Sequence, residues 1–126
     1  MRWNTRLWTT LAAISGGLSV AAGAFAAHGV ADPTARDWLR TGATYEMTHA
    51  LATLACAFLV TIGATRARLA PVLFLTGSAL FSGSLYAMAL GAPRWLGAVT
   101  PIGGVLFLAG WGVLAWAAMG LSRQVG

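Results

Sequence analysis

Apolar residues fill four long segments of the chain, and charged residues and prolines separate these segments. Each segment is close to the roughly 20 residues that a helix needs to cross a bilayer. Backbone polar groups have no water partners in lipid, so such spans are expected to be helices. The pattern predicts transmembrane helices at about residues 7–27, 45–64, 71–90 and 101–120.

Helix-start signals refine this picture. Asp32 before Pro33 is typical of a helix N-terminus and predicts a short interfacial helix between the first and second spans. This helix either stands alone or runs into the second span, with Gly42 as the candidate break. Thr100 before Pro101 predicts an N-cap for the last span. The other loops are short, which favours antiparallel neighbours. The expected fold is all-α, a single-domain, up-down, four-helix transmembrane bundle.

Composition agrees with a membrane protein. The 126 residues are 58% hydrophobic and 9% charged, whereas soluble domains carry about 25% charged residues. All eight basic residues are arginines at predicted helix ends rather than on one face, which excludes a nucleic-acid-binding protein and leaves the lipid bilayer as the expected surroundings. One side of the membrane would hold Arg2, Arg6, Arg66, Arg68 and Arg123, and the other Arg36, Arg40 and Arg94. The positive-inside rule therefore predicts that both termini are cytoplasmic.

The first segment leaves one alternative open. Arg2, Arg6, the apolar run and Ala24-Phe25-Ala26 also resemble a secretory signal with a cleavage site. The apolar run is longer than the usual 7 to 15 residues of a signal, so a retained helix is the favoured interpretation.

Small residues recur at helical spacing and predict close helix packing. The ridges are Ser15, Ser19, Gly23 and Ala27 in the first span, Ala79, Gly83, Ala87 and Gly91 in the third, and Gly103, Gly110 and Ala117 in the fourth. Packing within the chain is the favoured interpretation, and association with another copy or another membrane protein is the alternative.

The polar residues inside the second span are candidates for a functional role. Glu46, His49, Thr53 and Cys56 share one helix face, and Glu46 with His49 forms an E-x-x-H pair. Di-metal bundles need two such pairs and two further glutamates. Because Glu46 is the only glutamate, that centre is excluded within one subunit, and no metal or other cofactor is assigned.

A polar cleft near the outer face is the candidate site. Its predicted members are His28, Glu46, His49 and Tyr86, with Arg36, Arg40, Thr53, Ser82 and Trp111 in supporting positions. The favoured interpretation is structural, with Glu46 and His49 bonding to each other and to Arg36, Arg40 or loop carbonyls. The Trp111 indole needs an acceptor, and a serine of the third span is a candidate. No nucleophile–base pair or phosphate-binding loop is visible, so no catalytic residue is predicted.

Several strings across the chain resemble domain-of-unknown-function family 423 (DUF423). They are Leu11-Ala-Ala-Ile-Ser-Gly16, Gly23-Ala-Phe-Ala-Ala-His-Gly29, Phe81-Ser-Gly-Ser-Leu-Tyr86, Thr100-Pro-Ile-Gly-Gly104 and Gly110-Trp111. The family comprises small bacterial inner-membrane proteins that also resemble animal transmembrane protein 256. The resemblance implies four transmembrane helices and a retained first helix. It implies no particular activity. Its pattern often has glutamine where this chain has Glu46, which argues against an obligatory proton relay there.

Three hypotheses about function follow. The leading one is a non-enzymatic accessory or interaction component of the inner membrane. The second is a protein that handles a small molecule, a lipid or protons at the polar cleft. The third is a haem- or quinone-associated redox subunit.

Overall fold

The computed structural model describes residues 2–122, and over that range the chain is helical with no strand. The elements are α1 (Thr5–His28), α2 (Pro33–Thr61), the 3₁₀ helix η1 (Thr65–Leu69), α3 (Ala70–Ala89), the 3₁₀ helix η2 (Arg94–Ala98) and α4 (Thr100–Met119). The four α-helices are long and apolar enough to cross a membrane. The predicted all-α fold with four membrane-spanning helices is therefore confirmed.

Helix α2 is longer than predicted. Asp32 caps it by accepting a hydrogen bond from the Ala35 amide at 3.0 Å, as the Asp-Pro signal indicates. No separate interfacial helix follows, because the backbone continues through Gly42 to the end of the span. The Tyr86 ring lies against Gly42, and the Gly42 carbonyl accepts a hydrogen bond from Ser82 at 2.7 Å. These tertiary contacts hold the glycine in helical geometry, where the sequence pattern had suggested a break.

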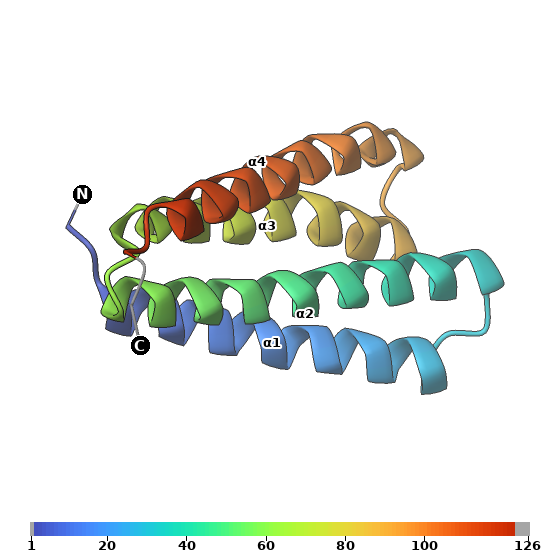
Figure 1. The fold of residues 1–126 in the computed structure, drawn as a ribbon. Helices are drawn as coiled ribbons and strands as arrows, with labels where there is room; N and C mark the ends of the chain where they lie inside the picture. The colour runs from blue at the N-terminus through green and yellow to red at the C-terminus, as the bar shows by residue number, and fades with distance from the viewer. Residues whose placement is uncertain (1, 123–126) are drawn as a thin grey trace.

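Consecutive helices run antiparallel and pack against each other, α1 on α2, α2 on α3 and α3 on α4. Figure 1 shows the α1–α2 pair beside the α3–α4 pair, with the start of α1 and the end of α4 at the same end of the bundle, the end nearest the termini. Helices α2 and α3 form the centre, with α1 outside α2 and α4 outside α3. The arrangement is open rather than a closed square bundle.

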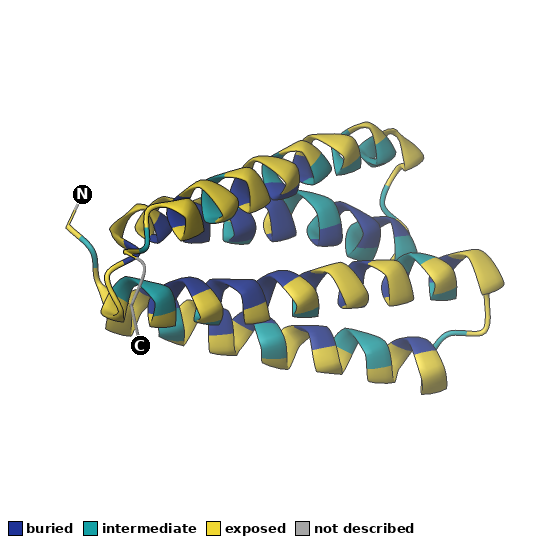
Figure 2. Cartoon of the chain, viewed as in Figure 1, coloured by how far each residue is buried: buried dark blue, intermediate teal, exposed yellow. Residues whose placement is uncertain are grey.

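The helices bury their inner faces and expose apolar outer faces. In Figure 2 the buried positions lie mainly on the sides of the helices that face neighbouring helices, and the exposed positions lie mainly on the outer sides. Phe74 is fully buried in the core, whereas Val20, Phe58 and Leu108 are more than half exposed. Exposed apolar side chains of this size suit hydrocarbon surroundings better than water.

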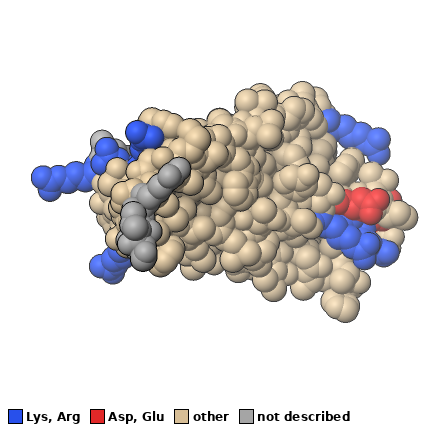
Figure 3. Space-filling model, viewed as in Figure 1, with Lys and Arg blue, Asp and Glu red and all other residues tan. Residues whose placement is uncertain are grey.

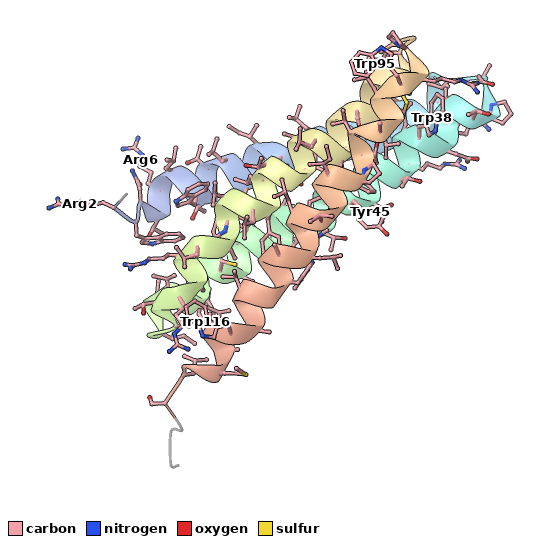
Figure 4. The ribbon with its side chains drawn as sticks, turned by 90° about the horizontal axis from the view of Figure 1, so that it is seen from above. Arg2, Arg6, Trp38, Tyr45, Trp95 and Trp116 are labelled. Atoms are coloured by element: carbon pink, nitrogen blue, oxygen red, sulfur yellow. The ribbon has the colours of Figure 1, made fainter. Side chains whose placement is uncertain are left out.

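Charged side chains gather at the two ends of the molecule, and the central part of the visible face carries no charged residue (Figure 3). Arg2 and Arg6 lie at the end that holds the termini, and Trp38 and Trp95 lie at the opposite end (Figure 4). The predicted contribution of Arg123 to this asymmetry lies outside the described residues.

The start of α4 differs from its prediction. Thr100 is the first residue of the helix rather than its N-cap, and Val99 precedes it without a side-chain cap. The Thr100 hydroxyl instead shares a hydrogen bond with the Ser84 hydroxyl at 2.6 Å. The 3₁₀ helix η2 leads directly into α4, so the side chain of Thr100 is available to join α4 to α3.

Candidate functional site

Glu46 ties three helices together at the middle of the bundle. Its side chain is only 7% exposed. Ser15 of α1 donates a hydrogen bond to Oε2 at 2.9 Å, and Tyr86 of α3 donates one to Oε1 at 2.8 Å. Both carboxyl oxygens therefore have a hydroxyl partner, which removes much of the cost of burying this group in an apolar environment.

His49 joins α2 to α4 through a different set of partners. Its Nδ1 lies 2.6 Å from the Tyr45 carbonyl, and the indole Nε1 of Trp111 donates to its Nε2 at 3.0 Å. An indole N–H only donates and a carbonyl only accepts, so the geometry requires a neutral imidazole with its proton on Nδ1. The Phe107 ring stacks on the imidazole with 3.5 Å between ring centroids.

The structure separates the two halves of the predicted E-x-x-H pair. Glu46 faces Ser15 and Tyr86, while His49 faces Trp111, and the two side chains do not bond to each other. Residues three apart on a helix differ in direction by about 60°, which is enough to serve two interfaces. The sequence prediction of a serine partner for Trp111 is wrong, because the partner is His49.

The predicted arginine partners lie elsewhere. Arg36 donates to the Val30 carbonyl at 2.8 Å, which closes the loop between α1 and α2. Arg40 is exposed on α2 and makes no hydrogen bond to Glu46 or His49. The hydrogen bonds of Glu46 within residues 2–122 come from two hydroxyls and none from a basic group.

His28 does not join the other three members of the predicted cleft. It is exposed at the last position of α1. Ser15, the α1 residue that contacts Glu46, lies 13 positions earlier (28 − 15), which is about 20 Å along a helix. Glu46 and His49 lie near the middle of α2 rather than at its outer end, because α2 begins at Pro33 and not near Tyr45, and Tyr86 reaches Glu46 from α3.

Two supporting residues act on the backbone of α2. Thr53 donates to the His49 carbonyl at 2.8 Å, and Ser82 donates to the Gly42 carbonyl from α3. A Cβ on Gly42 would lie 2.6 Å from the Tyr86 ring, so this glycine makes room for the tyrosine that reaches Glu46. Sequence reasoning missed Ser15 and this role of Gly42. The isolated glycine inside a helical pattern was the available signal.

The structure places the predicted packing glycines in four different settings. A Cβ on Gly103 would lie 2.5 Å from the Phe81 amide nitrogen, and one on Gly110 would lie 2.5 Å from the Phe74 ring. A Cβ on Gly23 would lie 3.9 Å from that of Ala43, an ordinary van der Waals contact. Gly83 has nothing within 4 Å of its Cβ position, and Gly91 has a φ of +103°. Gly91 therefore ends α3 in a left-handed conformation and is not part of a packing ridge.

An open groove remains between α1 and α3, with a volume of about 280 Å³. Leu18 and Ala22 form one wall, Ala79 and Gly83 form part of the other, and Glu46, Ser78 and Tyr86 complete the lining. The Ser78 side chain is 4% exposed, and its hydroxyl has no hydrogen-bond partner. A buried hydroxyl without a partner is uncommon in a folded protein, so this one calls for an explanation.

The site offers few groups to a metal ion. Residues 2–122 contain no cluster of three or more histidine, cysteine, aspartate or glutamate side chains suited to hold one. Axial ligation of a haem by His49 would require Nε2, which already accepts the Trp111 hydrogen bond. The site therefore supplies hydrogen-bonding contacts between helices more readily than coordination chemistry.

Comparisons with known proteins agree with the resemblance seen in the sequence. The family model described as "Protein of unknown function (DUF423)" matches residues 22–104. A UPF0382 membrane protein of Haemophilus influenzae is 46% identical over 86% of this chain and 90% of its own length. The UPF0382 inner membrane protein YgdD of Escherichia coli K12 is 39% identical over 96% of this chain and 95% of its own length.

A UPF0382 membrane protein of Staphylococcus epidermidis is 38% identical over 90% of this chain and 96% of its own length. No solved structure matches the chain. The family match covers more than half of the chain, and these relatives align along nearly all of it. The chain therefore belongs to the DUF423 family of membrane proteins.

Proposed function

We propose that this chain is a non-enzymatic interaction component of the bacterial inner membrane, which associates through a helix face that its own bundle leaves open. Its relatives are named as membrane or inner membrane proteins, and its four long helices are apolar enough to span a bilayer. The polar clusters at Glu46 and His49 support a structural role, because their partners come from all three of the other helices.

The observation that carries the proposal is the uncovered ridge of small residues on α3. Ala79 is exposed, Gly83 has open space at its Cβ position, and Ser78 beside them has an unpartnered hydroxyl. Elsewhere on α3 a small residue already packs against another helix, since a Cβ on Gly77 would lie 2.7 Å from the Phe107 ring of α4. Small residues let helix backbones approach closely in lipid, and polar side chains add hydrogen bonds across the interface.

The occupant that we propose is the same face of a second copy of this chain. A ridge of small residues is self-complementary, so a two-fold pairing would bury it on both subunits at once. The Ser78 hydroxyl would then gain a partner across the interface. A helix of another membrane protein is the competing occupant, and the experiment distinguishes the two.

Association is best measured between labelled copies of the full chain in lipid vesicles, by energy transfer as a function of the protein-to-lipid ratio. Gly83→Leu is expected to weaken association at least tenfold, about 1.4 kcal/mol, because the side chain would fill the space that a partner helix needs. The matched control is Gly112→Leu on α4, where a Cβ also meets nothing within 4 Å.

Both variants should fold, since neither leucine meets another atom near its Cβ. Equal melting temperatures of the two variants in detergent would establish this. A wild-type protein that stays monomeric at every ratio would rule out the second copy as the occupant. Equal association of Gly83→Leu and Gly112→Leu would rule out the α3 ridge as the interface.

A second candidate function, small-molecule or proton handling, rests on Glu46 lining the same groove as Ser78. A ligand with a hydrogen-bonding group could reach both residues in place of a helix. This candidate predicts that a small molecule copurifies with the wild-type protein and is lost in both Ser78→Ala and Glu46→Gln. An absorbance scan of the same sample, without a haem or quinone signal, would argue against the redox alternative.

A further inference from the structure

A second and larger groove runs between α2 and α4, with a volume of about 640 Å³. It forms because α2 and α4 both pack on α3 and leave a gap between themselves. Figure 4 shows α4 crossing the bundle on the side where Tyr45 lies. The groove is lined by Thr44, Tyr45, Thr48, His49, Phe81, Pro101, Gly104, Val105, Phe107, Leu108 and Trp111.

The walls of this groove suit a hydrocarbon chain. Tyr45 and Phe81 lie with ring centroids 4.6 Å apart, and Phe107 lies 5.4 Å from Phe81. The two threonine hydroxyls already have partners, since Thr44 donates to the Arg40 carbonyl and Thr48 donates to the Thr44 carbonyl. Both nitrogens of His49 are likewise bonded. Apart from the hydroxyl of the exposed Tyr45, the lining offers a polar ligand few side-chain groups that are not already bonded, whereas an alkyl chain would displace none of these bonds.

An arginine side chain, Arg40, lies beyond the outer end of the groove. Thr44 lines that end, and Arg40 lies one turn earlier on the same face of α2. Arg40 is exposed, and one helical turn carries it about 5.4 Å further toward the end of the bundle. Arg36 on the same helix is held by the Val30 carbonyl, which leaves Arg40 as the cation of this helix next to the groove. A guanidinium group matches the geometry of a phosphate and is a common lipid-headgroup ligand.

We infer that the groove between α2 and α4 binds an anionic phospholipid, with one acyl chain along Tyr45, Phe81 and Phe107 and the phosphate at Arg40. The acyl chain fills an aromatic-lined space that the helices leave open. The positive charge of Arg40 at the outer end of the groove selects an anionic headgroup. The site is separate from the α1–α3 groove, since Ser78 and Gly83 line only that one.

The test uses full-length protein purified in detergent, stripped of lipid and titrated with phosphatidylglycerol or phosphatidylcholine in native mass spectrometry. Gly104→Leu should weaken binding of both lipids about tenfold, because its side chain would enter the groove. The Cβ itself fits, since its nearest atom is Phe81 Cδ2 at 4.0 Å. Arg40→Gln should weaken phosphatidylglycerol roughly fivefold and remove its advantage over phosphatidylcholine.

Two matched controls keep the result specific. Gly112→Leu places the same side chain on α4 outside the groove, and Arg94→Gln removes an arginine at the same end of the bundle, where it lies over the Trp38 ring. Both should bind phosphatidylglycerol as the wild type does. If Gly104→Leu and Gly112→Leu bind equally, the groove is not the site. If Arg40→Gln keeps the full preference for phosphatidylglycerol, Arg40 does not hold the phosphate.

Discussion

Glu46 and His49 lie three residues apart on α2 and serve different interfaces. Glu46 accepts hydrogen bonds from α1 and α3, and His49 accepts one from α4. Each contact is directional, so each one restricts how the neighbouring helix can rotate about its own axis. In lipid the hydrophobic effect does not drive helices together, and such contacts are worth about 0.6 kcal/mol on average. Their value here lies in fixing helix orientation as well as in adding stability.

Replacement of the Glu46 carboxyl group tests this role directly. Glu46→Gln should change stability by less than about 1 kcal/mol, because the amide can still bond to both hydroxyls. Glu46→Leu should cost about 1–3 kcal/mol, because it leaves Ser15 and Tyr86 without their acceptor. Unfolding of the protein in mixed micelles would measure both changes. Equal stability of the two variants would show that these hydrogen bonds do not hold the helices.

At the scale of the elements, α3 and α4 approach each other closely at two glycines. The Cβ position of Gly103 lies 2.7 Å from the Gly77 carbonyl oxygen, so the two backbones are nearly in contact. Such proximity is possible only where both helices lack a side chain at the crossing point. The glycine ridge of α4 is therefore used inside the bundle, while much of the ridge of α3 lies on a different face and stays open.

Two adjacent glycines of α4 give a matched pair of variants. Gly103→Ala should destabilise the protein by about 1–3 kcal/mol, because its methyl group would overlap backbone atoms of α3 that cannot move independently. Gly104→Ala should have little effect or a small benefit, since its nearest atom is 4.0 Å away. Melting temperatures of the two variants in the same detergent would check this. A smaller loss of stability in Gly103→Ala than in Gly104→Ala would contradict the packing of α3 on α4.

At the scale of the whole molecule, charge separates the two ends of the bundle. Arg2, Arg6, Arg66 and Arg68 belong to the end that holds the termini and η1, without an acidic residue among the described positions there. The opposite end mixes Arg36, Arg40 and Arg94 with Asp32 and Asp37. Basic residues are retained on the cytoplasmic side during insertion, so this asymmetry favours cytoplasmic termini.

Reporter fusions to the full chain test this orientation. Green fluorescent protein at the C-terminus should fluoresce, and alkaline phosphatase at the same position should be inactive, because the first folds in the cytoplasm and the second in the periplasm. Alkaline phosphatase inserted into the loop between α1 and α2, at Ala31, should be active. The reverse pattern would contradict the positive-inside assignment for this chain.

The sequence by itself determined the four helices and most of their ends. Hydropathy and capping are local properties, so Asp32-Pro33 predicted a helix start that the structure contains. The sequence also indicated that Glu46 and Tyr86 belong to one polar cluster and that Gly103 and Gly110 are packing positions. Few polar residues occur inside the spans, which limits the partners that each of them can find.

Tertiary structure alone decided how each helix is rotated and how far it is shifted along its neighbours. That rotation sends Trp111 to His49 rather than to a serine, and it leaves His28 far from both polar clusters. It also turns the α3 ridge at Gly83 away from the chain's own helices and opens the groove between α2 and α4. The physical reason is that a nearly all-apolar helix has little local pattern to mark its inner face, so contacts with other helices select it.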